Sequence, residues 1–209
     1  MPDALPTPAA LLALLEARRS VRRFRPDPVT QPQISALVAA AAAAPSAGNR
    51  QGWRLLLVTS RPRIDAMAEA VRREVGRLRG ELRGDAAETA DAYLENFLHF
   101  AGAPLVVAPI HRSGIDLLQA AGAAPREARG AADALASVAA AIQNLLLCAH
   151  AQGLGACWMT GPLVAAAALG ELLEVPRGWA LSALVPVGVP AEEPPAPPRR
   201  DAGQLVRWL

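Results

Sequence analysis

The stretch AADALASVAAAIQNLLLCAHAQ, residues 131–152, decides how the rest of the chain must be arranged. Apolar side chains recur along it at the spacing of an α-helix, in a stripe wide enough to be buried on most sides. The stripe comprises Leu135, Val138, Ile142, Leu145, Leu146 and Ala149. Gly153 follows and is typical of a helix end. We therefore expect a long central helix with the other elements packed around it.

Short apolar runs bounded by glycine and proline predict the strands of a sheet. They are WRLLLVTS (residues 53–60), which we expect to lie centrally, APLVVAPI (103–110) and WALSALVPVGVP (179–190), with a strand-like turn at GACWMTGP (155–162). Helices are predicted over residues 8–18, from an N-cap at Thr30 to Pro45, between 61 and 100, and over 164–173. A loop is predicted over 113–130. This alternation indicates an α+β or α/β layered domain.

Composition bounds the size of the fold and the kind of anion site it can build. With 209 residues, 52% of them apolar, the chain can bury one sizeable core. We expect one domain over residues 1–209, with an extended arm over 195–209 after a proline-rich spacer. All 21 basic residues are arginine, so any anion site must use arginine. A net charge of +2, spread over several helices, argues against nucleic acid as a partner.

The cysteines and the N-terminus indicate the compartment. Cys148 and Cys157 lie in apolar surroundings without the spacing of a zinc site, so we expect two free, buried thiols and no metal. Asp3 and several prolines precede the first apolar run, which lacks the basic start of a secretory signal. No apolar stretch free of charges and helix breakers reaches the roughly 20 residues of a membrane span. We expect a cytoplasmic, reduced protein without a membrane partner.

Two arginine groups could bind an anion. ARRSVRRFRP, residues 17–26, carries five arginines where a helix ends. It could be a solvated helix end with weak ion pairs, or a site at which guanidinium groups and a hydroxyl bind a dianionic phosphate. Arg199 and Arg200 follow the proline spacer. They could be a solvated pair, or close on the same phosphate.

Two further segments carry polar or small residues in suggestive places. PSAGNRQ, residues 45–51, could bind the urea-like edge of a planar heterocycle through its amides, or be an ordinary turn. GLGACWMTGP, residues 153–162, contains three glycines. They could allow another group to approach the backbone closely, or they could simply form a tight helix-to-strand turn. It does not match a dinucleotide-binding fingerprint.

At these four places together the sequence resembles the nitroreductase family of flavin enzymes. ARRSVRRF resembles the family's RRSxRxF, APSAGNRQGW resembles APSxxNxQPW, and GLGACWMTGP resembles its GLG turn. VPVGVPAEEPPAPPRR resembles the closing G-x-P that a basic pair follows. Gly52 stands where the family usually has proline. In this order the similarity covers nearly the whole chain.

The resemblance implies a fold and a cofactor site. The fold is α+β, a three-layer α/β/α sandwich with a central, mainly antiparallel sheet and a long central helix. The protein would be a homodimer in which the C-terminal arms are exchanged. It would bind FMN at two sites in the dimer interface. The ribityl chain and phosphate would be held by Arg18, Arg19, Ser20 and Arg22. Arg199 or Arg200 would complete the phosphate site. Pro45, Ser46, Ala47, Asn49 and Gln51 would come from the other subunit or line the isoalloxazine edge. Met159, Thr160 and Gly161 would approach the ring, with a backbone N–H near N5.

The resemblance also implies a reaction in which no side chain is the catalyst. NADH or NADPH would reduce FMN at N5, and a small electron acceptor such as a nitroaromatic or quinone would then take the hydride by a ping-pong mechanism. Arg50 or Arg54 could add positive charge near the pyrimidine edge. Alternatives in the same superfamily are dehalogenation, flavin fragmentation to a benzimidazole and dehydrogenation. A flavin-binding protein without turnover is the alternative outside enzymes.

Overall fold

The five strands of the described residues form one sheet around β2. The computed structural model describes residues 5–81, 93–112 and 128–209, so most of the predicted loop 113–130 lies outside the described residues. The strands are β1 (Trp53–Val58), β2 (Leu105–Arg112), β3 (Gly155–Ala156), β4 (Trp179–Leu181) and β5 (Val185–Gly188). Their order is β1-β2-β5-β3, with β4 also paired to β2, and every pairing is antiparallel. Among the described strands, only β2 combines neighbours on both sides with six consecutive buried residues.

Two expectations about the strands are wrong. β1 lies at the edge of the described sheet, and Arg54 and Leu57 on it are exposed. Residues 179–190 form two strands, because the backbone of Leu184 leaves the β2 ladder and exchanges two hydrogen bonds with Met159, at 3.0 and 2.9 Å. A local apolar pattern cannot show where a strand changes its partner.

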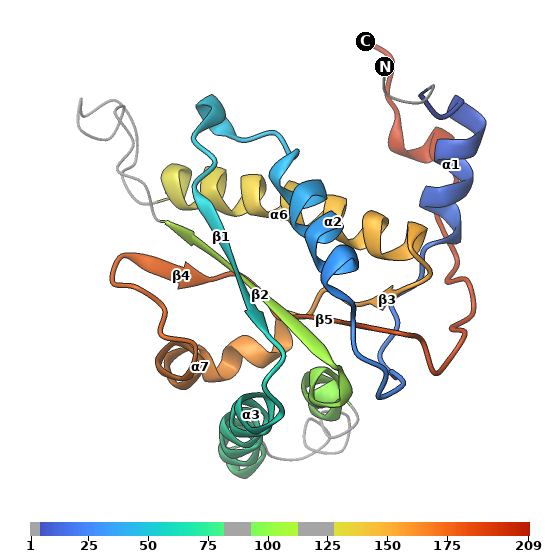
Figure 1. Ribbon diagram of the computed structural model, residues 1–209. Helices are drawn as coiled ribbons and strands as arrows, with labels where there is room; N and C mark the ends of the chain where they lie inside the picture. Colours follow the sequence, from blue (N-terminus) through green and yellow to red (C-terminus); the bar gives the residue numbers. More distant parts are fainter. Residues whose placement is uncertain (1–4, 82–92, 113–127) are drawn as a thin grey trace, which may run out of the picture.

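Helices cover both faces of the sheet, which gives three α/β/α layers and the α+β class (Figure 1). One face carries α2 (Gln31–Ala42) and α6 (Ala128–Ala151). The other carries α3 (Arg61–Glu81), the 3-10 helices η2 (Asn96–Gly102) and η3 (Gly161–Ala165), and α7 (Ala166–Leu172). The predicted N-cap of α2 is confirmed, because the Thr30 N–H donates to the Gln33 side chain at 2.9 Å.

Among the residues of α6 whose burial is described, the first buried one is Val138. Val138, Ala141, Ile142, Leu145, Leu146 and Ala149 are buried in the α2 face of the core. Leu135, which we expected in the same stripe, is 47% exposed, and its neighbours over residues 132–137 are also exposed or half-buried. Ala132–Ala151 has the length and apolarity of a membrane span, with a mean hydropathy of 1.6. About one third of this window, 33%, is buried inside the protein, where it packs against α2 and the sheet.

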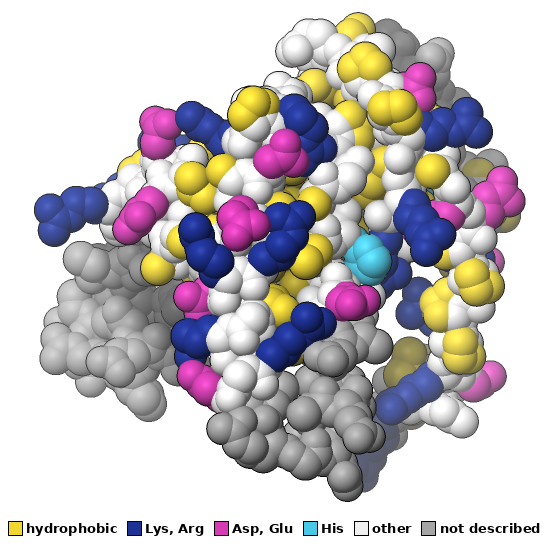
Figure 2. Space-filling model, turned by 90° about the horizontal axis from the view of Figure 1, so that it is seen from below, with side chains coloured by type: hydrophobic (Ala, Val, Ile, Leu, Met, Phe, Trp, Pro, Cys, Tyr) yellow, Lys and Arg dark blue, Asp and Glu magenta, His cyan; other side chains and the backbone are white. Residues whose placement is uncertain are grey.

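The outer face over α3 carries both signs of charge. Figure 2 shows arginine and acidic side chains interspersed on this side of the molecule. Along α3, Arg61 pairs with Asp65 at 2.9 Å and Arg77 pairs with Glu74 and Glu81 at 2.9 and 2.6 Å. Pairs at this spacing support a solvated helix face.

Both ends of the chain leave apolar side chains uncovered. Helix α1 (Pro8–Ala17) has no buried residue and exposes Leu11, Leu12 and Leu15. The last residues, after η4 (Ala202–Leu205), expose Val206, Trp208 and Leu209. Exposed apolar surface of this kind is typical of an interface.

Candidate functional site

The arginine run is an extended segment held in the sheet layer. The Val21 N–H donates to the carbonyl of Ala156 in β3 at 3.1 Å, and the Arg25 N–H donates to the carbonyl of Val189 at 2.9 Å. Gly155 lets the segment approach β3, since a Cβ there would lie 2.7 Å from the Cβ of Val21. Residues 21–25 therefore pair through backbone hydrogen bonds with β3 on one side and with the residues after β5 on the other, as neighbouring strands do.

The two ends of the chain line one pocket of about 330 Å³, which we call the arginine pocket. One wall consists of Arg18, Arg19, Ser20 and Arg22, and the other of Pro194, Pro195, Pro197 and Arg199. Arg200 does not line the pocket. The structure therefore brings together four of the predicted phosphate ligands from the start of the chain and one of the two candidates from its end.

Arg18 places a buried nitrogen without a hydrogen-bond partner in this pocket. Its Nη1 atom is buried and forms no hydrogen bond to any described residue. Arg19 is used differently, because its Nη1 donates to the carbonyls of Glu16 and Arg18 at 2.6 and 3.0 Å, at the end of α1. A buried donor without an acceptor is rare and costly. An anion with several acceptor oxygens fits the donors that line this pocket.

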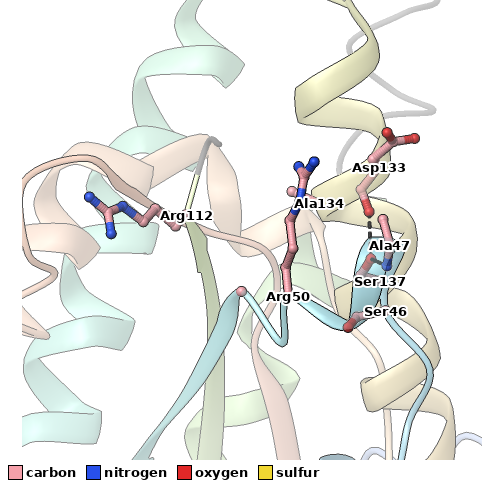
Figure 3. Close-up of a pocket in the computed structure, with 8 residues that line it drawn as sticks. Ser46, Ala47, Arg50, Arg112, Asp133, Ala134 and Ser137 are labelled. Atoms are coloured by element: carbon pink, nitrogen blue, oxygen red, sulfur yellow. Dashed lines mark hydrogen bonds between the residues drawn. The ribbon is translucent and has the colours of Figure 1, made fainter. Parts of the chain in front are cut away.

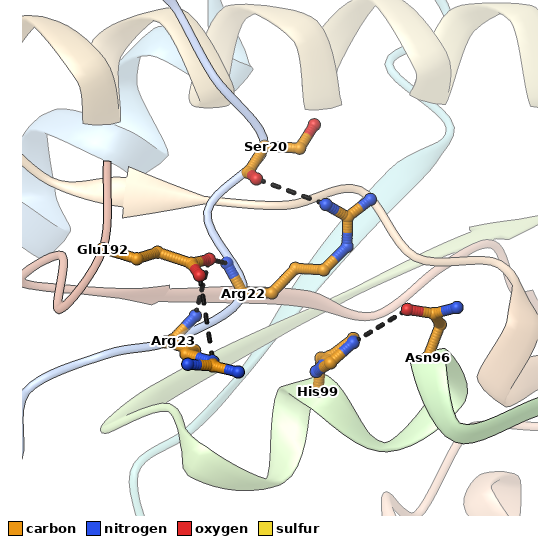
Figure 4. Close-up of polar contacts among 6 residues, drawn as sticks. All are labelled: Ser20, Arg22, Arg23, Asn96, His99 and Glu192. Atoms are coloured by element: carbon orange, nitrogen blue, oxygen red, sulfur yellow. Dashed lines mark hydrogen bonds and ion pairs between the residues drawn. The ribbon is translucent and has the colours of Figure 1, made fainter. Parts of the chain in front are cut away.

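An acidic residue that the sequence did not single out holds the arginine segment in place (Figure 4). The Glu192 Oε1 atom accepts hydrogen bonds from the backbone N–H groups of Arg22 and Arg23, at 2.7 and 3.1 Å. Its Oε2 atom lies 3.9 Å from Nε of Arg23. No local pattern could identify this contact, since 170 residues separate Arg22 and Glu192 in the sequence.

His99, on η2, lies beside the same network. Its Nε2 atom is 2.9 Å from Oδ1 of Asn96, and Figure 4 shows both side chains near the guanidinium of Arg22. Burial lowers the pKa of His99 below its ordinary value, and the positive charge of Arg22 lowers it further. His99 is thus disfavoured as a cation next to the arginines.

A second pocket, of about 180 Å³, lies where residues 46–52 meet the start of α6 (Figure 3). We call it the loop pocket; it is lined by Ser46, Ala47, Arg50, Gly52, Arg112, Asp133, Ala134 and Ser137. The Ala47 N–H donates to Oγ of Ser137 at 3.2 Å, which fixes the loop to α6. Of the predicted ligands, Ser46 and Ala47 line this pocket, whereas Pro45, Asn49 and Gln51 do not.

The loop beside this pocket is conformationally strained. Gly48, Asn49 and Gln51 have φ values of 58°, 51° and 47°, in the left-handed region that residues with a Cβ rarely adopt. Hydrogen bonds hold it in shape, because the Gln51 N–H donates to Oγ of Ser46 at 2.9 Å and its side chain donates to Oδ1 of Asn49 at 3.1 Å. Strain that the surroundings maintain is typical of binding loops.

The turn after β3 packs closely against Leu184 and Phe97. Met159 is buried in the core on the α3 face, and its backbone N–H and carbonyl both pair with Leu184. A Cβ on Gly161 would fall on the ring of Phe97, so this glycine is needed for packing. Thr160 is exposed. Among the further candidates, Arg54 stacks on Trp179, 4.6 Å from the ring centroid, whereas Arg50 lines the loop pocket.

The arginine pocket and the loop pocket lie at opposite ends of α6. Asp133, Ala134 and Ser137, in its first turns, line the loop pocket, whereas β3, which follows its last turn, contacts Ser20. With a rise of about 1.5 Å per residue, the helix from Ser137 to Ala151 is about 21 Å long. Figure 1 shows the same separation, with η1 (Ala47–Asn49) and α1 near different ends of α6.

No metal centre is evident among the described residues. Within them, no group of three or more His, Cys, Asp and Glu side chains lies close enough to hold an ion. Cys148 and Cys157 are free, as expected, although Cys148 is half-buried. His111 pairs with Ser182, with 2.7 Å between Nδ1 and Oγ, and burial lowers its pKa.

Comparison with known proteins identifies the family. The model of the nitroreductase family matches residues 15–189, which is most of the chain. The chain belongs to the nitroreductase family. The predicted family and the predicted α+β fold of this nitroreductase-family chain are thereby confirmed.

Those relatives carry different names. The chain is 35% identical over 201 residues to a 5,6-dimethylbenzimidazole synthase from Rhodospirillum rubrum, covering 93% of this chain and 89% of the relative. It is 33% identical over 217 residues to an NADH dehydrogenase from Thermus thermophilus, with both covered completely. Among solved structures, a BluB-like flavoprotein from Clostridium difficile 630 superimposes with a TM-score of 0.82 at 25% identity, over 95% of this chain and 98% of that one. An iodotyrosine deiodinase bound to FMN and 3-iodo-L-tyrosine gives 0.75 at 25% identity, with the same coverage.

Acidification should destabilise this nitroreductase-family protein in part through His99. The unfolded chain has a His pKa of about 6.5. Since the folded-state pKa is lower, the unfolded state binds more protons, and stability falls as the pH drops from above 6.5 toward the folded-state value. His99→Gln should therefore lose less unfolding free energy than wild type between about pH 7 and about pH 5.5 in urea denaturation. Parallel losses in the two proteins would show that His99 does not contribute.

Proposed function

We propose that this chain binds FMN through the arginine pocket and is an FMN-dependent oxidoreductase. The observation that carries the proposal is the buried, unpartnered Nη1 atom of Arg18 in a pocket with Arg22 and Arg199 on its walls. A phosphate supplies acceptor oxygens and negative charge at the same point. The FMN in the iodotyrosine deiodinase structure supports this cofactor for the family.

In this proposal, the residues at the chain ends hold the phosphate and ribityl chain. They are Arg18, Arg19, Ser20, Arg22 and Arg199. We assign the second arginine group to Arg199 rather than Arg200, because Arg200 does not line the pocket. Exposed Thr160 and the adjacent Gly161 would approach the ring through the backbone, with Met159 anchoring the turn in the core.

The other half of the site would come from a second copy of the chain. The two pockets lie near opposite ends of α6, whose stretch from Ser137 to Ala151 is about 21 Å long, whereas a five-carbon ribityl chain is much shorter. Ser46, Ala47, Asn49 and Gln51 of one protomer would therefore serve the flavin held by its partner. The apolar side chains exposed on α1 and on the last residues of the arm would be buried in this homodimer.

When bound, FMN would supply the atom that accepts a hydride from NADH or NADPH and delivers it to a nitroaromatic, quinone or similar acceptor. The protein would bind, orient and shield the reactants. Arg50 lines the loop pocket, so it is better placed than Arg54, which stacks on Trp179, to set positive charge near the pyrimidine edge.

Flavin fragmentation to a benzimidazole is a second candidate. The name of the Rhodospirillum rubrum relative and the TM-score of 0.82 to the BluB-like flavoprotein favour it. In that case reduced FMN would be the substrate, and the same arginine pocket would bind its phosphate.

Replacing Arg18 should weaken FMN binding. Arg18→Ala removes the buried guanidinium, and loss of a charge-assisted contact to phosphate should raise the FMN dissociation constant roughly 10- to 100-fold. Fluorescence quenching of FMN by the purified protein measures this constant. Arg25→Ala is the matched control, because it removes the same charge from the same segment but does not line the pocket. Equal effects of the two substitutions would refute the phosphate assignment.

Mixed dimers should reveal a site shared between protomers. One variant carries Arg18→Ala; the other carries Asn49→Gly and Gln51→Gly, which remove both amides while tolerating the positive φ. If each site combines two protomers, a mixed dimer has one intact site and one doubly altered site. Differently tagged chains, co-purified, should then bind about one FMN per dimer at concentrations where neither variant alone is loaded. Failure of the mixed dimer to recover FMN would place the site within one chain.

The two candidate reactions differ in the fate of the flavin. For an oxidoreductase, NADH or NADPH under argon should bleach the bound flavin, and adding a quinone or nitroaromatic should restore its full absorbance. For a benzimidazole-forming enzyme, reduced FMN should be consumed when air is admitted, and 5,6-dimethylbenzimidazole should be detected by mass spectrometry. A protein that bleaches negligibly and forms no product would be a flavin-binding protein without turnover.

A further inference from the structure

Glu192 satisfies backbone donors that the neighbouring strand leaves without an acceptor. Next to it, the Ala191 N–H donates to the Arg23 carbonyl at 3.0 Å, and the Arg25 N–H donates to the Val189 carbonyl at 2.9 Å. Among the described residues, no backbone carbonyl accepts from the N–H groups of Arg22 and Arg23. The Glu192 carboxylate takes both, at 2.7 and 3.1 Å, and its side chain is 29% exposed.

The contact lies at the start of a stiff segment that leads to Arg199. PPAPP, residues 194–198, follows Glu192 and Glu193, and proline restricts the backbone to a narrow range of φ. Pro194, Pro195 and Pro197 line the arginine pocket before Arg199 does. In a chain this stiff, the point at which Glu192 is attached decides where Arg199 lies.

We infer that Glu192 is a positioning residue for the anion site: it fastens the arginine segment to the arm, so that Arg199 faces the same pocket as Arg18 and Arg22. The inference rests on the proposed function, because the anion is taken to be the phosphate of FMN. By charge alone, a carboxylate near this pocket would weaken anion binding. Positioning therefore predicts the opposite sign from simple electrostatics when Glu192 is neutralised.

FMN and riboflavin binding to the full-length protein test the inference. Glu192→Ala should raise the FMN dissociation constant about tenfold and Glu192→Gln somewhat less, because the Gln oxygen can still accept a hydrogen bond. Riboflavin, which lacks the phosphate, should bind both variants as it binds wild type. Hydrogen exchange at the amides of Arg22 and Arg23 should also accelerate in Glu192→Ala.

Glu193 provides the matched control. It is adjacent in sequence and exposed, and Glu193→Ala removes the same charge without touching the arginine segment. Equal FMN affinity of Glu192→Ala and Glu193→Ala, tighter FMN binding by Glu192→Gln, or equal weakening of FMN and riboflavin would overturn the role of Glu192. If Glu192→Ala does not fold, Glu192→Gln gives the same comparison. Wild-type protein that binds no FMN would instead overturn the proposed function, and with it this link to the cofactor.

Discussion

The backbone pairing of residues 20–25 with Ala156 on one side and with Val189 and Ala191 on the other is the constraint on which the rest of the site depends. It places the end of α1 beside the start of the C-terminal arm, although the two are far apart in sequence. Arginines from the two segments then line one pocket, where their mutual repulsion favours binding of an anion between them. The close approach is possible because Gly155 has no side chain to meet Val21.

Both candidate binding regions carry a local cost that the surrounding fold maintains. In the arginine pocket the cost is a buried guanidinium nitrogen without an acceptor. In the loop beside the second pocket it is the left-handed backbone at Asn49 and Gln51. Hydrogen bonds that the loop backbone donates to Ser46 and to Ser137 on α6 hold it in this shape. In the arginine pocket, an anion would supply the acceptor that the Arg18 nitrogen lacks.

The central helix fills the core and separates the two pockets. Its second half fills the space between α2 and the sheet, and its length separates the two pockets. In the proposed homodimer, this separation is the reason why each flavin would be served by two protomers. The family scaffold is shared by relatives named for different reactions, so the scaffold alone does not specify the chemistry.

The sequence by itself determined the long helix, the buried strand β2, the cap of α2 and the family, because each depends on residues within a few positions of one another or on short motifs. Tertiary structure alone decided that β1 is an edge strand, that residues 179–190 divide into two strands, that Leu135 is exposed, and that Arg199 rather than Arg200 reaches the pocket. It also decided that Arg54 stacks on Trp179 and that Glu192 binds the arginine segment. These features depend on contacts between segments far apart in the chain, and periodicity along a single segment carries no information about which distant partner it will meet.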